Sequence, residues 1–484
     1  MLCVIHKTAG SAEGKAKDAI AEIGTIRRKS ESTVEFVRAG KNASMNQRRL
    51  LVIADREPSL AVDGESYTMS HHIAGFGRSW RIDLLHVSPS APARPYSVDD
   101  EEKTFERSIQ IPPPPMPGRL YRTLGEISGE RPFFLQPVPP KQELARRMSG
   151  CSYDAIYVAS SRLSAWAGAV ASLMSRRPKC VLALSDSLSE TMRRDWELAR
   201  LRSFPYRSRI WHAVRSVRAL TMPRAEAKLI DGFDLVLVQT QTDRNAVIDD
   251  CGPGAADKML VTPNGVKEAL LSLPYDGADR KRLVHLGPVS RERRNLLFWF
   301  LRTVYPRLKR SHPEVQLDVV GSINARDRKR LESIGGVRVR GFVADLRDVF
   351  AQTTLSVSPV FMRCGLVTKV LDSMAAGVPA SGIGTFNGFE NFHNGVHGFE
   401  ARSADEWSKM LIDLLDQPEL LRQVSANARE MVRAEFRWPE TAEKIHERLE
   451  ALCSSGRGCV CSVFSGGRNS ASTPRVSSGR RRVG

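Results

Sequence analysis

The sequence predicts an α/β protein with two doubly wound halves that face each other across a cleft. Short apolar segments recur along the chain, and most end in Ser, Asp or Thr, which is typical of buried parallel strands. Segments with helical apolar spacing alternate with these strands, and a strand–helix–strand order implies parallel pairing. The chain has 484 residues, 42% of them apolar and 26% charged, which suits two globular domains with tails.

The first half is expected over residues 48–275. It begins with an apolar strand at 50–54, followed by a loop with Asp63 and Gly64 and by a helix that carries His71. The next strand completes a strand–helix–strand unit and so fixes the parallel sheet. Further strands are expected at 81–88, 153–160, 180–187, 233–240 and 259–266.

A polar, proline-rich insertion at 89–118 contains the run "IPPPPMPG". Proline runs favour the polyproline II conformation and cannot continue a central strand. We expect a stiff loop here, and a ligand for a partner domain is the alternative.

The second half is expected over residues 276–435. A long helix is predicted from about 295 to 310, and another from 404 to 436. A last helix at 436–453 follows, and a disordered N-terminal extension and basic C-terminal tail are expected at 1–47 and 454–484. Strands are expected at 282–290, 315–322, 337–343, 353–360 and 378–383.

The formal net charge is +18, from 72 Lys and Arg against 54 Asp and Glu. Such a surface favours anionic lipid, nucleic acid or phosphorylated substrates, although a solvated basic surface explains it equally well. No apolar run approaches the ~20 residues of a membrane span, and the start lacks the apolar core of a signal peptide. We therefore expect a cytoplasmic protein. The eight cysteines show no zinc spacing, which favours reduced thiols and no metal site.

Polar residues follow the expected strands of the first half. Asp186, Ser187 and Thr240 lie at strand ends, and in open α/β sheets these ends face the ligand crevice. Pattern alone thus places them at a functional edge. Asp186 serves equally well as a helix N-cap or turn residue.

The stretch "GLVTKVLDSMAAGVP", residues 365–379, reads as a glycine loop that leads into a short helix. A helix N-terminus carries unpaired N–H donors and suits a phosphate, and Lys369 in the first turn adds a full charge. Asp372, one turn along, is placed to accept hydrogen bonds from sugar hydroxyls. A surface ion pair between Lys369 and Asp372 is the other interpretation, and spacing alone leaves the two balanced.

Signatures of several other enzyme classes are missing from the sequence. It has no G-x-x-x-x-G-K-[ST], no H-E-x-x-H and no G-x-S-x-G. A phosphate-binding loop of the P-loop type, a zinc protease and a serine hydrolase of the nucleophile-elbow type are therefore not indicated.

The segment "SPVFMRCGLVTKVLDSMAAGVPA" resembles the signature of the retaining nucleotide-sugar glycosyltransferases of family 4, also called glycosyl transferases group 1, in a branch found in bacterial exopolysaccharide synthesis. Other landmarks agree in order and spacing: "LLVIADREPSLAVDGES", "FDLVLVQTQTD", "VTPNGV", "LGPVSRERRNLLFWFLRTVYPRL", "RGFVADLRDVF" and the late "FRW". The resemblance covers about residues 48–452. It implies the GT-B fold, two Rossmann-like domains around a cleft.

The resemblance also implies the reaction. A sugar of hexosyl type would move with retention from a UDP or GDP donor to a glycan or lipid-linked acceptor, with no cofactor and no required metal. Asp186 and Lys369 are the expected catalytic residues: the lysine meets diphosphate charge, and the aspartate orients the acceptor or the sugar. The implied donor-binding residues are Arg294, Asn295, Gly365, Leu366, Lys369 and Asp372, and the implied residues of the cleft loop are Asp63, Gly64 and His71.

Three positions depart from the family pattern. Cys364 stands where an acidic residue is common, Pro288 where an arginine is common, and Asp63-Gly64 where the loop usually reads Gly-Gly. The leading hypothesis is a transferase of surface polysaccharide biosynthesis that sits peripherally at the inner face of an anionic membrane and binds no specific nucleic acid. The alternative is a weak or inactive GT-B protein that acts as a basic scaffold on membrane or nucleic acid.

Overall fold

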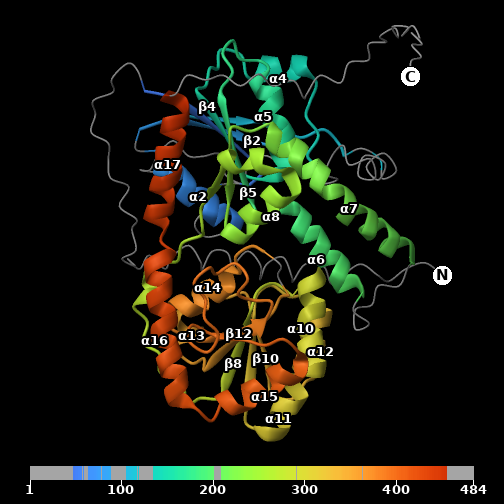
Figure 1. Ribbon diagram of the computed structural model, residues 1–484, viewed down its shortest axis with the longest axis vertical. Coiled ribbons are helices and arrows are strands. Elements are labelled where there is room, and N and C mark those ends of the chain that lie inside the picture. Colours follow the sequence, from blue (N-terminus) through green and yellow to red (C-terminus); the bar gives the residue numbers. More distant parts are fainter. Residues whose placement is uncertain are drawn as a thin grey trace, which may run out of the picture. The chain divides into compact units, whose positions relative to one another are not determined.

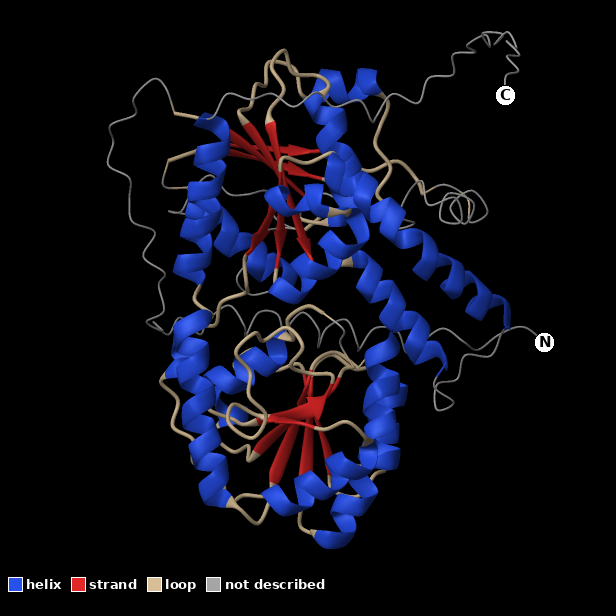
Figure 2. Cartoon of the chain, in the orientation of Figure 1, coloured by secondary structure: helices blue, strands red, loops and turns tan. Residues whose placement is uncertain are grey.

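The computed structural model describes residues 47–56, 58, 64–77, 79–88, 105–116, 118, 135–200, 209–289, 291–361 and 364–454 (Figure 1). These residues form two parallel β-sheets with helices on both faces of each, which confirms the predicted α/β, Rossmann-like GT-B architecture (Figure 2). Asp63, most of the proline-rich insertion, the extension up to residue 46 and the tail from residue 455 lie outside the described residues.

The first sheet has the strand order β3-β2-β1-β4-β5-β6-β7, and every neighbouring pair is parallel. Helices cover both faces, so the central strands are apolar along their whole length, and residues 50–54 are fully buried. The strands are β1 (Arg49–Ala54), β2 (Arg81–His86), β3 (Arg107–Gln110), β4 (Ala155–Val158), β5 (Lys179–Ser185), β6 (Leu235–Val238) and β7 (Met259–Val261).

The helices of this half follow the strands in alternation. The helices α6 and α7 pack against each other, and α7 continues past Pro223. The helices are α2 (Gly64–Phe76), α4 (Lys141–Arg147), α5 (Ser164–Ala171), α6 (Leu188–Arg200), α7 (Arg209–Asp231), α8 (Gln241–Cys251) and α9 (Glu268–Leu271), and single 3-10 turns lie at Ser161–Leu163 and Pro253–Lys258.

The interpretation of 89–118 as loop is wrong for residues 107–110. These form β3, which pairs in parallel with β2 at the edge of the sheet. The strand has only four residues and ends before the prolines at 112–115, because proline cannot donate to a sheet ladder. An edge strand this short carries too weak a pattern to be recognised in a proline-rich context.

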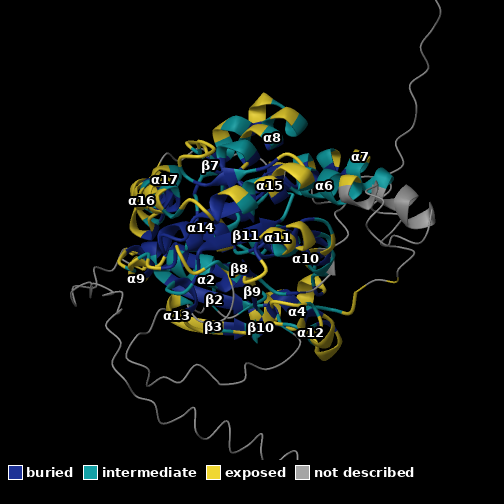
Figure 3. Cartoon of the chain, turned by 90° about the horizontal axis from the view of Figure 1, so that it is seen from below, coloured by how far each residue is buried: buried dark blue, intermediate teal, exposed yellow. Residues whose placement is uncertain are grey.

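The second sheet has the order β10-β9-β8-β11-β12-β13 and is also parallel. The strands of both sheets are largely buried (Figure 3). The strands are β8 (Arg282–Leu286), β9 (Gln316–Val320), β10 (Val337–Gly341), β11 (Leu355–Pro359), β12 (Ala380–Ile383) and β13 (Phe399–Glu400). The helices are α10 (Arg291–Thr303), α11 (Tyr305–Ser311), α12 (Ala325–Glu332), α13 (Arg347–Phe350), α14 (Thr368–Ala375), α15 (Ala404–Leu414), α16 (Pro418–Glu435) and α17 (Trp438–Ser454).

Two helices predicted as continuous are interrupted at prolines. The helix expected over 295–310 is split between α10 and α11, and Pro306 lies in the first turn of α11. The helix expected over 404–436 is likewise split, with Pro418 opening α16. Proline lacks an N–H and collides with the preceding turn, but it is well accommodated at the first helical positions. Apolar periodicity alone did not reveal these breaks.

The last helix, α17, packs against α2 of the first half. The helices approach closely at Gly75, where an added Cβ would lie 2.8 Å from the Cβ of Ala442. Trp438, the first residue of α17, stacks on His71 with ring centroids 4.3 Å apart and an interplanar angle of 4°. Gly265 of the "PNGV" motif leaves room for Trp438, since a Cβ on Gly265 would fall 2.4 Å from the backbone nitrogen of Trp438.

Candidate functional site: the donor loop and the facing strand ends

The loop between β11 and α14 contains Cys364, Gly365 and Leu366 and is called the donor loop below. Gly365 has a φ of +83°, a left-handed conformation that glycine adopts at no steric cost. A Cβ on Gly365 would lie 2.7 Å from Oδ1 of Asp186, so the aspartate carboxylate lies directly against this glycine. The structure thus brings together two of the residues that the sequence predicted for the site.

We expect Gly365→Ala to lower the free energy of unfolding by about 2–4 kcal/mol. A left-handed backbone costs an L-residue about 1–2 kcal/mol, and the added methyl group also displaces the Asp186 carboxylate. Gly395→Ala is a matched control, because Gly395 has a φ of +81° but open space around its Cβ position. Chemical denaturation of both variants measures the difference, and equal losses would show that Asp186 does not pack on the loop.

Asp186 follows β5 directly, and Ser185 before it has a φ of +68°, which turns the chain sharply out of the strand. Burial, and next the charge of Asp243, raise the pKa of Asp186 to about 7, while Arg194 and Arg293 act in the opposite direction. Burial also raises the pKa of Asp243. The two carboxyl groups therefore hold a proton well above the usual range of aspartate.

The raised pKa of Asp186 makes stability fall with pH. Because its pKa is higher in the folded than in the unfolded state, the folded protein binds the extra proton, and this contribution is lost as pH rises from about 4 to about 7. We expect Asp186→Asn to raise the melting temperature at pH 8 by about 2 °C or more and to leave it nearly unchanged at pH 4.5. The exposed Glu447→Gln serves as the control. Thermal scans at both pH values test this, and an equal shift at both would contradict it.

Asp243 was not predicted from the sequence. It lies in the first turn of α8, its side chain is fully buried, and its carboxylate accepts hydrogen bonds from the Ser187 N–H (3.0 Å) and the Gly365 N–H (3.1 Å). Thr240, the N-cap of α8, donates its hydroxyl to the same carboxylate and accepts from the Asp243 N–H at 3.0 Å. The pattern Thr-x-x-Asp in "TQTD" is a capping signal, so sequence indicates a helix start here but not the contact with the donor loop.

Cys364, at the position where the family pattern has an acid, also hydrogen-bonds to Asp243. The thiol is buried, and burial together with the neighbouring Asp243 raises its pKa, which keeps it protonated. The acidic side chains beside the donor loop are therefore Asp243 and Asp186 of the first half.

Lys369 and Asp372 form an ion pair with Nζ and Oδ2 3.7 Å apart, and the lysine side chain is 46% exposed. Both lie on α14, whose N-cap, Val367, offers no side-chain hydrogen bond to the helix. Burial raises the pKa of Asp372, and the charges of Lys369 and Lys267 lower it. Lys267, directly after "PNGV", also lies 5.3 Å from the centroid of the Tyr67 ring, and sequence reasoning missed it. Lys369 thus has an ion-pair partner and yet remains accessible to a ligand.

Arg294 forms its ion pair away from the donor loop, with Asp327. Its guanidinium bonds both carboxylate oxygens of Asp327 in α12, at 2.7 and 2.8 Å, and lies 5.2 Å from the centroid of the Phe298 ring. The charge of Arg293, one residue earlier, acts on Asp186. The neighbouring Asn295 is half-buried. Of the two arginines, Arg293 is therefore the one with an electrostatic effect at Asp186, whereas a donor-binding role for Arg294 stays a prediction.

His71 and Gly64, predicted for the cleft loop, lie on α2, and Gly64 is its first residue. His71 is enclosed by Trp438 and by Tyr67, whose ring centroid is 4.6 Å away. Burial, and next the charge of Lys267, lower the pKa of His71 to about 4, so the imidazole is neutral at pH 7. His71 thus joins α2 to α17, and a role in the acceptor site stays a prediction.

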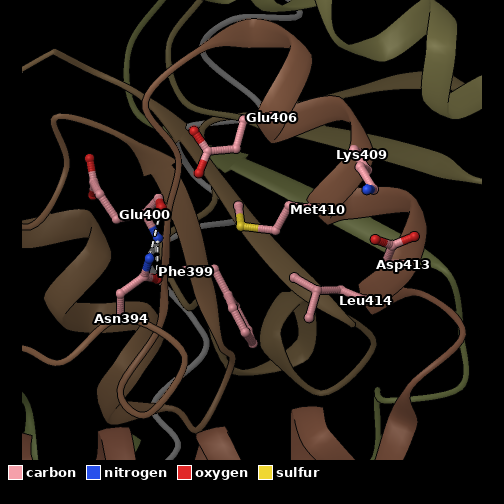
Figure 4. A pocket seen from close by; sticks show the side chains of 8 residues that line it. All are labelled: Asn394, Phe399, Glu400, Glu406, Lys409, Met410, Asp413 and Leu414. Carbon is pink, nitrogen blue, oxygen red and sulfur yellow. Dashed lines mark hydrogen bonds between the residues drawn. The ribbon is translucent and has the colours of Figure 1, made fainter.

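A hollow in the second half lies away from these residues. It measures about 320 Å³ and lies between α15 and β13, and none of the predicted site residues lines it (Figure 4). Its lining residues are Asn394, Phe399, Glu400, Glu406, Lys409, Met410, Asp413 and Leu414. Across the described parts of the chain, no three His, Cys, Asp or Glu side chains are grouped so that they could hold a metal ion.

Residues 280–417 match the model of the protein family described as "Glycosyl transferases group 1". The matched segment runs from β8 through the donor loop to α15. A search of the curated proteins found no match. The family match and the fold together support a glycosyltransferase of GT-B architecture.

Solved structures share the fold at low identity. Sucrose-phosphate synthase from Thermosynechococcus elongatus aligns with a TM-score of 0.60 and 16% identity over 85% of this chain and 100% of its own. HepE from Anabaena, solved in complex with UDP and glucose, aligns with a TM-score of 0.56 and 16% identity. The alignment covers 84% of this chain and 100% of HepE. The lipopolysaccharide outer core galactosyltransferase WaaB aligns with a TM-score of 0.54 and 11% identity, over 84% of this chain and 99% of its own. Each alignment spans both sheets.

Within the described residues, no helix combines the length and the apolar character that crossing a membrane requires.

Proposed function

We propose that the protein is a glycosyltransferase that moves a sugar from a nucleotide diphosphate donor to a glycan or lipid-linked acceptor. One observation carries the proposal: a left-handed glycine loop leads into the uncapped N-terminus of α14, with the accessible Lys369 in its first turn. Such a helix start offers N–H donors and a positive field to a phosphate group. The segment lies within the part that matches the glycosyltransferase family, and the similar HepE was solved with UDP.

The proposed chemistry is mainly electrostatic. The leaving diphosphate gathers negative charge, which the start of α14 and Lys369 stabilise in a site shielded from water. Asp372 accepts hydrogen bonds from the ribose of the donor. Asp186, at the end of β5 against Gly365, orients the acceptor or the sugar, and attack on the face from which the diphosphate leaves gives retention. The donor is of UDP or GDP type, and no cofactor is needed.

The proposed setting is surface polysaccharide assembly. The similarity to WaaB, named for the lipopolysaccharide outer core, supports such an acceptor class. The net charge of +18 favours residence at an anionic inner membrane face. The second candidate, a basic scaffold of low activity, is favoured by Cys364 at the position where the family pattern has an acid.

Turnover of a panel of UDP- and GDP-sugars tests the proposal. Release of UDP or GDP is measured with the full chain, alone and with glycan or lipid-linked acceptors, and we expect one donor to be consumed well above the others. The scaffold would instead bind anionic vesicles in a salt-dependent way and consume none of the donors.

A further inference from the structure

The Gly365 N–H in the donor loop has an acceptor within the protein itself. It donates to Oδ2 of Asp243 at 3.1 Å, and Asp243 belongs to α8 of the first half, 122 positions earlier in the chain. If the proposed function holds, on which this inference rests, the same N–H is one of the donors offered to the diphosphate. A single backbone N–H makes one strong hydrogen bond, so the two acceptors exclude each other.

The contact with Asp243 is part of a larger seam. Three consecutive residues at the start of α8 bond to loops of the second half: Asp243 to Gly365, Thr242 Oγ1 to the Asn387 carbonyl at 3.0 Å, and the Gln241 N–H to Glu390 at 3.1 Å. The seam is tightly packed, because a Cβ on Gly388 of the second half would fall 3.0 Å from Cγ2 of Thr240, the N-cap of α8. The start of α8 therefore closes over the donor loop.

Charge makes the exclusion stronger. The Asp243 carboxylate is fully buried and points at the loop, and the Asp186 carboxylate touches the same glycine. A diphosphate brought to this loop would face, at short range, the negative charge that this carboxyl pair still carries near pH 7. The place is poorly hydrated, so like charges repel strongly there. Asp243 also keeps partners of its own when the contact opens, since Ser187 and Thr240 bond to it within the first half.

We propose that Asp243 is a positioning residue that holds the donor loop closed in the free protein by occupying the Gly365 N–H, and that donor binding requires this bond to break. The diphosphate then takes the place of the carboxylate. Asp243 thereby sets the affinity for the donor without touching it.

The test measures UDP and GDP affinity by calorimetry for the wild type, Asp243→Asn and Asp243→Ser. The amide of Asn keeps one oxygen for the Ser187 N–H but removes the charge, and Ser is too short to reach Gly365. We expect both variants to bind the nucleotide about tenfold more tightly, since binding no longer breaks a bond to a charged acceptor. Thr242→Val removes a neighbouring bond of the seam without freeing the N–H, and its affinity should stay near that of the wild type.

A merely structural role of Asp243 predicts the opposite sign, so unchanged or weaker binding in the Asp243 variants overturns the inference. Amide hydrogen exchange of the donor loop without nucleotide measures the contact on its own: exchange at Gly365 should be faster in the Asp243 variants and unchanged in Thr242→Val. Equal exchange in all forms would also overturn the inference. If exchange behaves as expected but no form binds UDP or GDP, the proposed function fails while the contact stands.

Discussion

Lys369→Ala should weaken binding of the donor nucleotide about 10- to 100-fold, the loss expected when a charged hydrogen bond to a phosphate is removed. Lys369 is nearly half exposed and stands in the first turn of α14, beside the donor loop. Lysine opposes the helix dipole at this position, so helix stability alone does not account for it. Calorimetric titration with UDP and GDP measures the effect.

The control for this experiment is Lys409→Ala, which removes an exposed lysine from the hollow of the second half. Lys369→Ala should leave the free energy of unfolding within about 1 kcal/mol of the wild type, because an exposed ion pair contributes little. Unchanged nucleotide affinity in Lys369→Ala would mean that the residue serves only as the partner of Asp372.

Trp438→Ala should give the largest loss of stability, about 3–5 kcal/mol in the free energy of unfolding. The indole is 5% exposed, stacks on His71 and lies 5.7 Å from Tyr67 between ring centroids. It also fixes the start of α17, the helix that packs on α2. Its removal leaves a cavity between these helices that the backbone near Gly265 is not expected to fill.

Denaturant unfolding followed by far-ultraviolet circular dichroism measures this loss without depending on tryptophan fluorescence. Phe342→Ala is the control, because this phenylalanine is 71% exposed and its truncation should change stability by about 0.5 kcal/mol or less. A loss below about 1.5 kcal/mol for Trp438→Ala would show that the stacking of α17 on α2 is weak.

The fold could be predicted because buried parallel strands and their helices leave a strong apolar pattern. The residues 50–54 read as a strand from their composition alone, and they form β1. The apolar pattern did not predict the helix break at Pro306, where the missing N–H of proline, and not side-chain burial, splits the predicted long helix in two. The pattern also did not indicate β3, because its four residues lie at the sheet edge and bury only part of their side chains.

The candidate site was predictable only where its residues are close in sequence. Gly365, Lys369 and Asp372 belong to one short segment, so their spacing indicates a shared site. Asp243 reaches Gly365 from another half of the chain, and no local pattern encodes that contact. Arg293 and Arg294 are neighbours, yet side chains one residue apart on a helix point about 100° apart, so only the structure separates their partners.

The central claim is that the donor loop and α14 bind the diphosphate of a nucleotide. A crystal structure of the full chain with UDP or GDP tests it most directly. We expect phosphate oxygens within hydrogen-bond distance of the Gly365 and Leu366 N–H groups and of Lys369 Nζ, with Asp243 withdrawn from Gly365. A nucleotide bound elsewhere, for example in the hollow between α15 and β13, would contradict the account.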